Sequence, residues 1–306
     1  MGTSVSVTAW HDDQNIVKRA VSAVMQEMHR IDATLSPYKE HSELSRVNRD
    51  AAKVPLQVSQ ELYFLVDKSL YFSRVSEGAF DITFASLGRY YDYRKKEKPD
   101  ANQHKKLLPA VNYQHIQLNK AEQSLYFSHP HVYIDLGGVA KGYAVDRAAQ
   151  ILRQAGIRHA TISAGGDSRV IGDKRGQPWL IGVKNPRQKP GEPDALIRMP
   201  LTDVAVSTSG DYERFFIDEE NNERVHHILN PKTGKSASRV VSVTVLGAKG
   251  VDTDPLSTTV FVLGVEKGLA LVNGLPGFDC VIIDSHGKAH YSDGLIEPEQ
   301  IKSKAQ

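Results

Sequence analysis

The sequence predicts an α+β fold in which mixed or antiparallel sheets are flanked by helices. Apolar residues at spacings of three and four predict one long amphipathic helix over residues 16–35. From residue 133 onward, short apolar runs with strand character intermix with helical patterns. Some of these runs stand singly between helices and others form hairpin-like pairs, for example around residues 172–176, which favours mixed sheets over a purely parallel one.

The first third of the chain is predicted to hold one strand and two helices. The opening MGTSVSVTAW alternates polar and apolar residues, which indicates a strand rather than a signal peptide. The helix over residues 16–35 follows. A second helix is expected to begin with Ser59 as its N-cap and to turn Leu62, Leu65, Val66 and Leu70 inward.

Residues 88–106, GRYYDYRKKEKPDANQHKK, interrupt this pattern with charge and one proline, and we interpret them as a solvated insertion. Their interleaved tyrosines and lysines could suit a polyanion, but no opposing basic face accompanies them. No linker or internal repeat stands out along the sequence. We therefore predict a single domain over residues 1–306, with two lobes that meet at the site.

The rest of the chain mixes the two periodicities. Strands are predicted over residues 159–163, 179–184, 204–209, 240–246 and 280–284, and helices over residues 140–155 and 255–263. Gly156 is placed to end the first of these helices as its C′ residue.

The composition excludes several classes of protein. A chain of 306 residues with 40% hydrophobic and 24% charged residues is typical of a globular protein with a substantial core. A net charge of +2 does not fit a dedicated nucleic-acid binder, so no nucleic-acid partner is expected. No apolar run approaches the ~20 residues that span a bilayer. Cys280 is the only cysteine, which excludes a disulfide within the chain.

The most informative motif is YIDLGGVAKGYAVD, residues 133–146. A short apolar strand runs into paired glycines and then opens a helix, an arrangement that lets backbone approach a ligand and points free N–H groups at an anion. Lys141 adds a cation in the first turn. The motif matches neither the GxxxxGK[ST] loop nor the GxGxxG fingerprint. Its simpler interpretation is a tight turn followed by an exposed lysine.

A second motif, VDTDPLSTTV, places Asp254 and Thr258 four residues apart on one helix face, where they could act as two hard oxygen ligands. Two ligands are too few for a tight site, so substrate phosphates and waters would complete a Mg²⁺ octahedron. The alternative is that Asp254 is a helix N-cap with Pro255 at N1. Together the two motifs suggest a metal-bound nucleotide.

Four further motifs have structural interpretations that stand beside functional ones. In GAFD, residues 78–81, the glycine could end a helix and Asp81 could be a turn residue before an apolar strand. SAGGD, residues 163–167, could be a hairpin or a loop whose backbone comes close to a ligand. STSGDYER at residues 207–214 and HHILNPKTG at residues 226–234 indicate two loops that flank a turn. One of His226 and His227 should face inward, where a hydrogen-bonded core histidine is as well supported as a catalytic one.

Taken in order, these motifs resemble those of the ApbE family, the FAD:protein FMN transferases. The resemblance begins with MGT at residues 1–3 and the S-x-Y and SELSRxN segment at residues 36–48. It continues through GAFD, DLGGVAKGYAVD, GGD, TSGDYER, HHIxxPxTG and DxLST to about residue 264. It implies FAD binding at Met1, Tyr38, Ala79, Phe80, Asp81, Asp135, Lys141, His227 and Ile228. It also implies a Mg²⁺ ion held by Asp254, Thr258 and the backbone carbonyl of Gly138.

The sequence departs from the family pattern at a few positions. Ile82 stands where proline is common, Asn230 where aspartate is common and Pro255 where alanine is common. None of these changes removes an expected metal ligand. Asn230 cannot act as a base, so proton abstraction would pass to His227 or Asp211. The tryptophan–glycine pair usual after GAFD is absent, which affects the shape of the flavin-side lobe.

The resemblance implies a reaction, and the residues suit it. FMN would be transferred from FAD to a Thr or Ser hydroxyl of an acceptor protein, with release of AMP. Mg²⁺ on the pyrophosphate would assist this transfer. His227 is the candidate general base because its unperturbed pKa lies near neutrality. The alternatives are an FAD pyrophosphatase that yields FMN and AMP, and an FAD-binding protein without turnover.

The resemblance also implies a partner and a location. The acceptor is expected to be a flavoprotein subunit with a D-[GA]-A-[TS]-[AS] motif, which this sequence lacks, so self-modification is not expected. A periplasmic or periplasm-facing location follows from the family. Membrane association is expected only through the acceptor or through an N-terminal anchor that has been removed.

Overall fold

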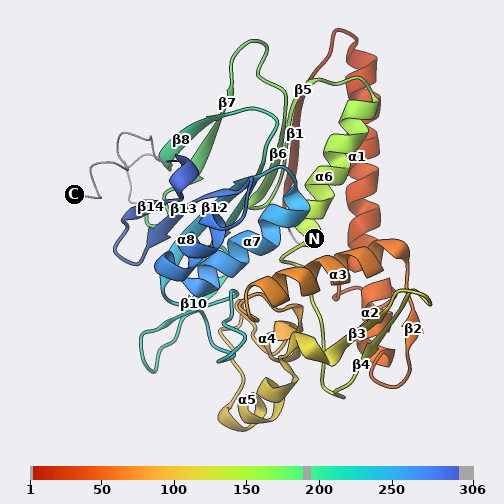
Figure 1. Ribbon diagram of the computed structural model, residues 1–306, viewed down its shortest axis with the longest axis vertical. Coiled ribbons are helices and arrows are strands. Elements are labelled where there is room, and N and C mark those ends of the chain that lie inside the picture. The colour runs from red at the N-terminus through yellow and green to blue at the C-terminus, as the bar shows by residue number, and fades with distance from the viewer. Residues whose placement is uncertain (1–2, 189–193, 296–306) are drawn as a thin grey trace.

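A seven-stranded antiparallel sheet forms the centre of the protein (Figure 1). The computed structural model describes residues 3–188 and 194–295, so the predicted ligand Met1 lies outside the described residues. The strand order is β1-β5-β6-β9-β12-β13-β14. These strands are β1 (Val5–Trp10), β5 (His159–Ala164), β6 (Asp167–Ile171), β9 (Ala205–Gly210), β12 (Val240–Gly247), β13 (Asp279–Asp284) and β14 (Ala289–Tyr291).

Three small sheets accompany the central one, in the orders β2-β4-β3, β7-β8 and β10-β11. Their strands are β2 (Leu56–Gln57), β3 (Ile116–Asn119), β4 (Ser124–Phe127), β7 (Trp179–Lys184), β8 (Ala195–Leu201), β10 (Phe215–Ile217) and β11 (Arg224–His226). All of the strand pairings are antiparallel, so the predicted α+β class with mixed or antiparallel sheets is confirmed.

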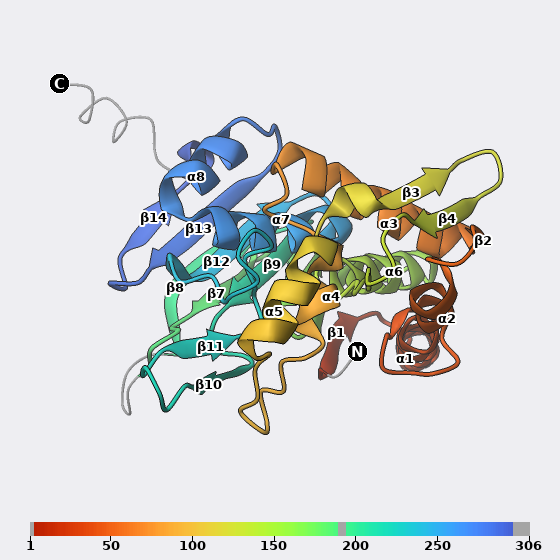
Figure 2. The same cartoon turned by 90° about the horizontal axis from the view of Figure 1, so that it is seen from below.

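The helices gather mainly on one side of the large sheet (Figure 2). The α-helices are α1 (Gln14–Leu35), α2 (Glu43–Asp50), α3 (Gln60–Val75), α4 (Ala85–Gly88), α5 (Ala101–Leu107), α6 (Ala140–Gln154), α7 (Gly250–Leu263) and α8 (Val265–Asn273). Short 3₁₀ helices occur at Ile82–Phe84, Leu108–Ala110, Tyr113–His115 and Asp293–Leu295. None of the helices in the described part of the chain is long and apolar enough to cross a membrane.

The predicted N-terminal helices form for the expected reasons. In α1 the buried positions are Ala20, Val24, Met28, Ile31 and Leu35, which recur at the predicted spacings of three and four. The Ser59 hydroxyl accepts a hydrogen bond from the Leu62 amide at 3.1 Å and so caps α3, as predicted. Gly156 follows α6 with φ +82°, the left-handed conformation expected of its C′ residue.

Strand β12 shows how the layers meet. All eight of its residues are buried, because both faces of the strand are covered. Val243 and Val245 face the main core together with the helices. Val241 and Leu246 belong to a second cluster with Val183 of β7 and residues of β8. The sequence of β12 is largely apolar, as expected of a strand buried on both faces, although Ser242 and Thr244 are buried as well.

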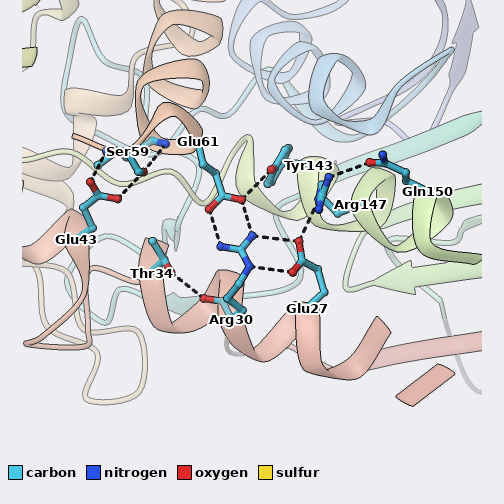
Figure 3. A network of polar contacts seen from close by, with 10 residues as sticks. Glu27, Arg30, Thr34, Glu43, Ser59, Glu61, Tyr143, Arg147 and Gln150 are labelled. Atoms are coloured by element: carbon cyan, nitrogen blue, oxygen red, sulfur yellow. Dashed lines mark hydrogen bonds and ion pairs between the residues drawn. The ribbon is translucent and has the colours of Figure 1, made fainter. Parts of the chain in front are cut away.

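A polar network joins three of these helices, α1, α3 and α6 (Figure 3). Arg30 of α1 donates hydrogen bonds to Glu27 on its own helix and to Glu61 of α3. Tyr143 of α6 donates to Glu61 at 2.7 Å, and Arg147 of α6 donates to Glu27 at 3.0 Å. The Arg30 hydrogen bonds, partly opposed by burial, lower the pKa of Glu27 to about 2.

The predicted hairpin around residues 172–176 is wrong. β6 pairs with β5 and β9 in the central sheet, whereas β7 pairs with β8 in a separate two-stranded sheet. The chain therefore leaves one sheet and enters another at this point. Turn residues such as Gly172 and Gly176 mark the reversal of direction, but they do not specify which strand the chain joins next.

Two other local predictions need correction. The chain after GAFD forms a 3₁₀ helix over Ile82–Phe84, capped by Asp81, and not a strand. Helix α7 begins at Gly250, five residues before Pro255, so Asp254 lies inside the helix and is not its N-cap. The early start depends on Asp146 of α6, whose carboxylate accepts hydrogen bonds from the Gly250 and Val251 amides. Such a cap from a distant helix leaves no local sequence signal.

Residues 88–106 are solvated only in part. Residues 94–98 are exposed, as predicted. Tyr91 and Tyr93, by contrast, stack with ring centroids 6.1 Å apart, and Tyr93 also packs against Phe216 of β10. Lys98 forms an ion pair with Asp218, and α5 begins at the end of the segment. The segment is therefore anchored to the β10–β11 hairpin.

The lone cysteine lies deep in the molecule. Cys280 belongs to β13 and is fully buried in the main core. Burial, with a smaller contribution from Asp279, raises the pKa of its thiol to about 12. The residue is therefore a structural thiol.

Candidate active site

The glycine motif reaches α6 along an extended segment that no sheet supports. Asn48 of α2 takes the place of a strand partner: its side chain accepts a hydrogen bond from the Ile134 amide at 2.8 Å and donates one to the Ile134 carbonyl at 2.9 Å. Asp135 then turns the chain, because its carboxylate accepts from the Gly137 amide at 2.6 Å. The predicted strand at residue 133 is thus extended backbone held by Asn48 and by Ser86, whose hydroxyl accepts a hydrogen bond from the Tyr133 amide at 2.9 Å.

Gly138 lies where three motifs converge. A Cβ atom at this position would stand 3.0 Å from the ring of Phe80 and 3.7 Å from the hydroxyl of Thr258. Phe80 belongs to GAFD and Thr258 to the second motif, so segments far apart in the sequence surround this glycine. The absence of a side chain leaves the Gly138 backbone accessible beside the Thr258 oxygen.

Lys141 is the charged centre of the site. Its ammonium nitrogen lies 2.7 Å from the Gly137 carbonyl, 2.9 Å from an Asp254 carboxylate oxygen and 2.9 Å from an Asp167 carboxylate oxygen. Both carboxylates are almost fully buried. An exposed lysine, the simpler interpretation of the sequence, is therefore wrong. Although burial opposes it, the two neighbouring carboxylates raise the pKa of Lys141.

The two acidic partners of Lys141 differ in how fully they are satisfied. Asp254 also accepts a hydrogen bond from the Gly142 amide at 3.0 Å. Asp167 follows the Gly165–Gly166 turn between β5 and β6, which is the hairpin that SAGGD suggested. Its second oxygen, Oδ1, is buried and has no hydrogen-bond partner in the described residues. Burial, together with the like charge of Asp167, raises the pKa of Asp254.

Helices α6 and α7 meet at two glycines, and this contact places Lys141 beside Asp254. A Cβ atom on Gly142 would stand 2.0 Å from the Gly250 carbonyl oxygen, and one on Gly250 would stand 2.4 Å from the Gly142 carbonyl oxygen. Only glycine permits such a backbone approach. The first turns of the two helices are therefore close enough for their polar side chains to share one site.

Strand β9 completes this part of the site. The Ser209 hydroxyl lies 2.8 Å from that of Ser257 and 3.2 Å from that of Thr258. Thr258 is one turn after Asp254 on α7, which confirms the predicted shared face. Several oxygen donors thus converge within a short length of α7, β9 and the glycine motif.

The GAFD residues have mainly structural contacts. Asp81 accepts hydrogen bonds from the Thr83 amide at 2.8 Å, the Thr83 hydroxyl at 2.6 Å and the Tyr113 amide at 2.7 Å. Ala79 and Phe80 are buried in the main core. The turn interpretation of Asp81 is therefore correct. Whether this motif also contacts FAD stays a prediction.

Arg214 links the other predicted residues. Its positive charge lowers the pKa values of Tyr38, Asp135 and His227, although burial has the larger effect on each. The Tyr38 residue is 81% exposed, so its ring is available to a flat ligand. Arg214 itself comes from TSGDYER, a motif that the sequence singled out without assigning this residue a role.

The two adjacent histidines have different environments. His226 is buried, and its ring nitrogens lie 2.6 Å from the Ala237 carbonyl and 3.3 Å from the Ile228 amide, so it is a hydrogen-bonded core residue. His227 is half-buried, and its Nδ1 has no partner among the described residues. Burial, with the charge of Arg214, lowers the pKa of His227 to about 3. This pKa is well below the unperturbed value near neutrality from which His227 was chosen as the candidate base.

The other candidate base, Asp211, is already paired with an arginine. Asp211 is held in a two-point ion pair by Arg187, with nitrogen–oxygen distances of 2.8 and 2.5 Å. Asn230 accepts a hydrogen bond from the Lys232 amide and so shapes the turn. Ile228 is 5% exposed and belongs to the core, which leaves its backbone as the part that could meet a ligand.

Sequence reasoning missed Asp167, Ser209, Asn48 and Asp146 as individual residues. Each lies within or beside a quoted motif, but the motif alone does not show which polar side chain is turned inward. The sequence signal available for Asp167 was its position directly after the glycine pair of SAGGD.

In this antiparallel α+β fold, carboxylate and hydroxyl oxygens and one ammonium group lie together at the start of a helix. Such a site is typical of a protein that binds an anionic ligand. The chain belongs to the ApbE family, whose family model matches residues 1–282. The predicted resemblance is thereby confirmed.

Relatives and solved structures agree with this assignment. A Treponema pallidum protein named FAD:protein FMN transferase is 29% identical over 298 residues, covering 92% of this chain and 81% of its own length. A Haemophilus influenzae protein of the same name is 30% identical over 284 residues, covering 88% and 80%.

The solved structures share the fold over nearly the whole chain. The ApbE protein of Thermotoga maritima superposes with a TM-score of 0.87 at 33% identity, covering 96% of this chain and 94% of its own. The flavin transferase ApbE of Vibrio cholerae gives a TM-score of 0.81 at 27% identity, with the same coverage.

Proposed function

We propose that this protein transfers FMN from FAD to a Thr or Ser hydroxyl of an acceptor protein and releases AMP. The observation that carries the proposal is the convergence of Lys141, Asp254, Thr258 and the Gly138 backbone at the start of α6. The names of the relatives, FAD:protein FMN transferase, support the same reaction. We infer that the flavin nucleotide lies between two lobes that meet at these residues.

The residues present fit a magnesium ion. Within the described residues no group of three or more His, Cys, Asp or Glu side chains could hold a metal, so any metal here would depend on other donors. The site offers the Asp254 carboxylate, the Thr258 hydroxyl and the Gly138 carbonyl, which are hard oxygen ligands of the kind Mg²⁺ prefers. The unpartnered, buried Asp167 oxygen adds a further polar atom nearby. When bound, Mg²⁺ would offset the charge of the pyrophosphate.

The chain's own groups would bind and orient FAD. The amides at the start of α6 and the Lys141 ammonium favour an anionic pyrophosphate. The exposed Tyr38 ring could stack on a flat ring of the nucleotide. Asp135 already orders the turn before α6. We propose that Met1, Ala79, Phe80, Asp81 and the backbone near Ile228 complete the contacts.

The transfer would form one phosphorus–oxygen bond and break another. The acceptor hydroxyl oxygen attacks the flavin-side phosphorus, the bond to the AMP oxygen breaks, and the hydroxyl proton passes to a base. We propose His227 for this role because it is neutral at pH 7 and its Nδ1 is unpartnered among the described residues. Its low pKa makes it a weak base in the free protein. A bound anionic pyrophosphate would raise that pKa.

Intact mass spectrometry tests the reaction. Purified protein is incubated with FAD, Mg²⁺ and an acceptor domain that carries a D-[GA]-A-[TS]-[AS] motif. We expect the acceptor to gain the mass of one FMN and an equal amount of AMP to appear. Free FMN and AMP without labelling would establish a pyrophosphatase instead. Intact FAD in every tube would establish a binding protein.

The metal assignment predicts the behaviour of one variant. Asp254→Ala should reduce Mg²⁺-dependent turnover by at least ~10²-fold, because it removes a charged oxygen donor at the site of transfer. Asp252→Ala is the matched control: Asp252 lies on the same helix but pairs with Lys68 at 2.8 Å. Asp254→Asn, which keeps the side-chain volume, checks that the loss does not come from misfolding. Wild-type turnover in Asp254→Ala would remove Asp254 from the metal site.

The acceptor and the location are proposals of the same kind. We propose a flavoprotein subunit as the acceptor and a periplasmic or periplasm-facing site of action, with membrane association only through the acceptor or a removed anchor. Fractionation of cells that express the full-length gene, followed by detection of flavin-labelled protein, tests both points. Labelled acceptor confined to the cytosolic fraction would contradict the location.

A further inference from the structure

A cavity lined largely by polar residues lies apart from the candidate active site. Its volume is about 460 Å³, and neither Lys141 nor Asp254 lines it. The walls come from α6, from β6 and from the loop between β12 and α7. The polar residues that line it are Asp146, Gln150, Arg153, Gln154, Arg169 and Lys249.

Arg169 is the unusual group in this cavity. It is only 7% exposed, yet its guanidinium is incompletely paired. Nη1 donates to the Val170 carbonyl at 3.2 Å, and Nε lies 3.5 Å from an Asp146 oxygen. Nη2 has no hydrogen-bond partner within the described part of the chain. Burial lowers the pKa of Arg169, but arginine remains charged at neutral pH.

The nearest carboxylate satisfies only one edge of this guanidinium. Asp146 accepts hydrogen bonds from the Gly250 amide at 2.9 Å and the Val251 amide at 3.0 Å, so its two oxygens serve as the cap of α7. Its contact with Arg169 is a single ion pair to Nε at 3.5 Å, which does not involve Nη2. A buried cation with free donors therefore faces the cavity.

Two more cations stand at the rim. Lys249 is exposed and makes no ion pair with any described residue. Arg153 pairs with the exposed Asp203 at 2.9 Å. The Gln150 carbonyl accepts from Arg147, which leaves the amide nitrogen of Gln150 free to donate. The lining thus presents several donors and a surplus of positive charge.

We propose that this cavity binds an oxyanion of the phosphate class, either as the free ion or as a group on a small molecule. The Nη2 hydrogens of Arg169 are free to donate to an oxyanion, and Lys249 supplies a point charge at the entrance. Hydrogen bonds from a charged guanidinium or ammonium group to an oxyanion are stronger than those between neutral groups. The site is independent of the proposed transfer of FMN.

Titration of the full chain with inorganic phosphate at constant ionic strength tests the proposal, with calorimetry as the readout. We expect saturable binding that weakens about tenfold or more in Lys249→Gln and in Arg169→Gln, as the loss of a charge-assisted hydrogen bond predicts. Lys120→Gln is the matched control, because Lys120 is exposed in the turn between β3 and β4 and lies outside the cavity. Turnover of FAD should stay within about twofold of wild type in Lys249→Gln.

The variants keep the proposal falsifiable. Arg169 is buried, so circular dichroism must show that Arg169→Gln folds. If it does not, Lys249→Gln and Arg153→Gln carry the test. A parallel titration with glycerol 3-phosphate, which is neither substrate nor product of the proposed transfer, distinguishes the sources: equal weakening for this ester and phosphate indicates a phosphate group on a larger molecule, and weakening for phosphate alone indicates the free ion. Unchanged phosphate affinity in all folded variants, or no saturable binding by wild type, would overturn the proposal.

Discussion

At the scale of single residues, Lys141 decides the charge balance of the candidate site. Three acceptors converge on its ammonium group, and two of them are buried carboxylates. A buried carboxylate without a cation is costly, so the lysine stabilises the site before any ligand binds. The sequence predicted Lys141, Asp254 and Thr258 as site residues from residue type and spacing. It could not predict Asp167 as a partner, because that contact depends on how β6 lies against α6.

His227 leads to a prediction about pH. Its pKa is about 3 in the folded protein, against about 6.5 in an unfolded chain. Between these two values the unfolded state binds more protons, so stability falls as the pH falls through this window. His227→Gln removes this term, and the variant should therefore gain stability relative to wild type by on the order of a few kcal/mol as the pH drops from 7 to 4.

Urea denaturation at pH 7 and pH 4 measures this effect. His286→Gln is the control, because His286 is exposed on the β13–β14 turn. If the stability difference between wild type and His227→Gln is the same at both pH values, the ring of His227 is not kept neutral by burial.

At the scale of elements, the contact between α6 and α7 positions the chemistry. Gly142→Ala would place a methyl group 2.0 Å from the Gly250 carbonyl oxygen, so the helices must separate. We expect a loss of about 3 kcal/mol in the free energy of unfolding, since the obstructing atom is backbone. Turnover should fall as well, because Lys141 and Asp254 move apart.

Chemical denaturation and turnover assays check this prediction, with Gly274→Ala as the control. A Cβ atom at Gly274 would meet its nearest neighbours at an ordinary 3.5 Å. A fully stable and active Gly142→Ala variant would show that the two helices are not held at this distance in solution.

The polar network around Arg30 is a second contact between helices that leads to a prediction. Arg30→Met keeps the apolar stem but removes the hydrogen bonds to Glu27 and Glu61 that join α1 to α3. We expect a loss on the order of 1 kcal/mol at pH 7, because the arginine is partly exposed to solvent. Glu27 has a pKa of about 2 when folded, so its contribution is present above about pH 4.5 and is lost as the pH falls toward 2.

Denaturation at pH 7 and pH 3 tests this sign. Arg19→Met on the exposed face of α1 is the control. The difference between Arg30→Met and wild type should shrink at pH 3. A difference that grows on acidification would mean that the carboxylates are not the partners that stabilise the helices.

Helices α1 and α3 were predictable because their periodicity and caps are local. The start of α7 was not predictable, because its cap comes from Asp146 on another helix. The pairing of β6 and β7 was mispredicted for a related reason. Turn residues record a change of direction, whereas sheet membership depends on contacts with strands distant in sequence.

At the scale of the whole molecule, one hydrophobic core runs from α1 through α7 to β13. We therefore predict that the chain unfolds in one cooperative step, as a single domain should. The fluorescence of Trp10 and Trp179 reports on β1 and β7, and far-ultraviolet circular dichroism reports on the helices. Both signals should change at the same denaturant concentration. Separate midpoints would show that the helical part and the sheet unfold as different units.

The buried thiol of Cys280 has a practical consequence for experiments on this protein. A maleimide reacts with accessible thiolates, and the folded chain presents none, because its only cysteine is buried with a pKa of about 12. A single fluorophore can thus be attached at a chosen surface position, for example through Lys120→Cys, without first removing a native cysteine. Wild-type protein then serves as its own unlabelled blank.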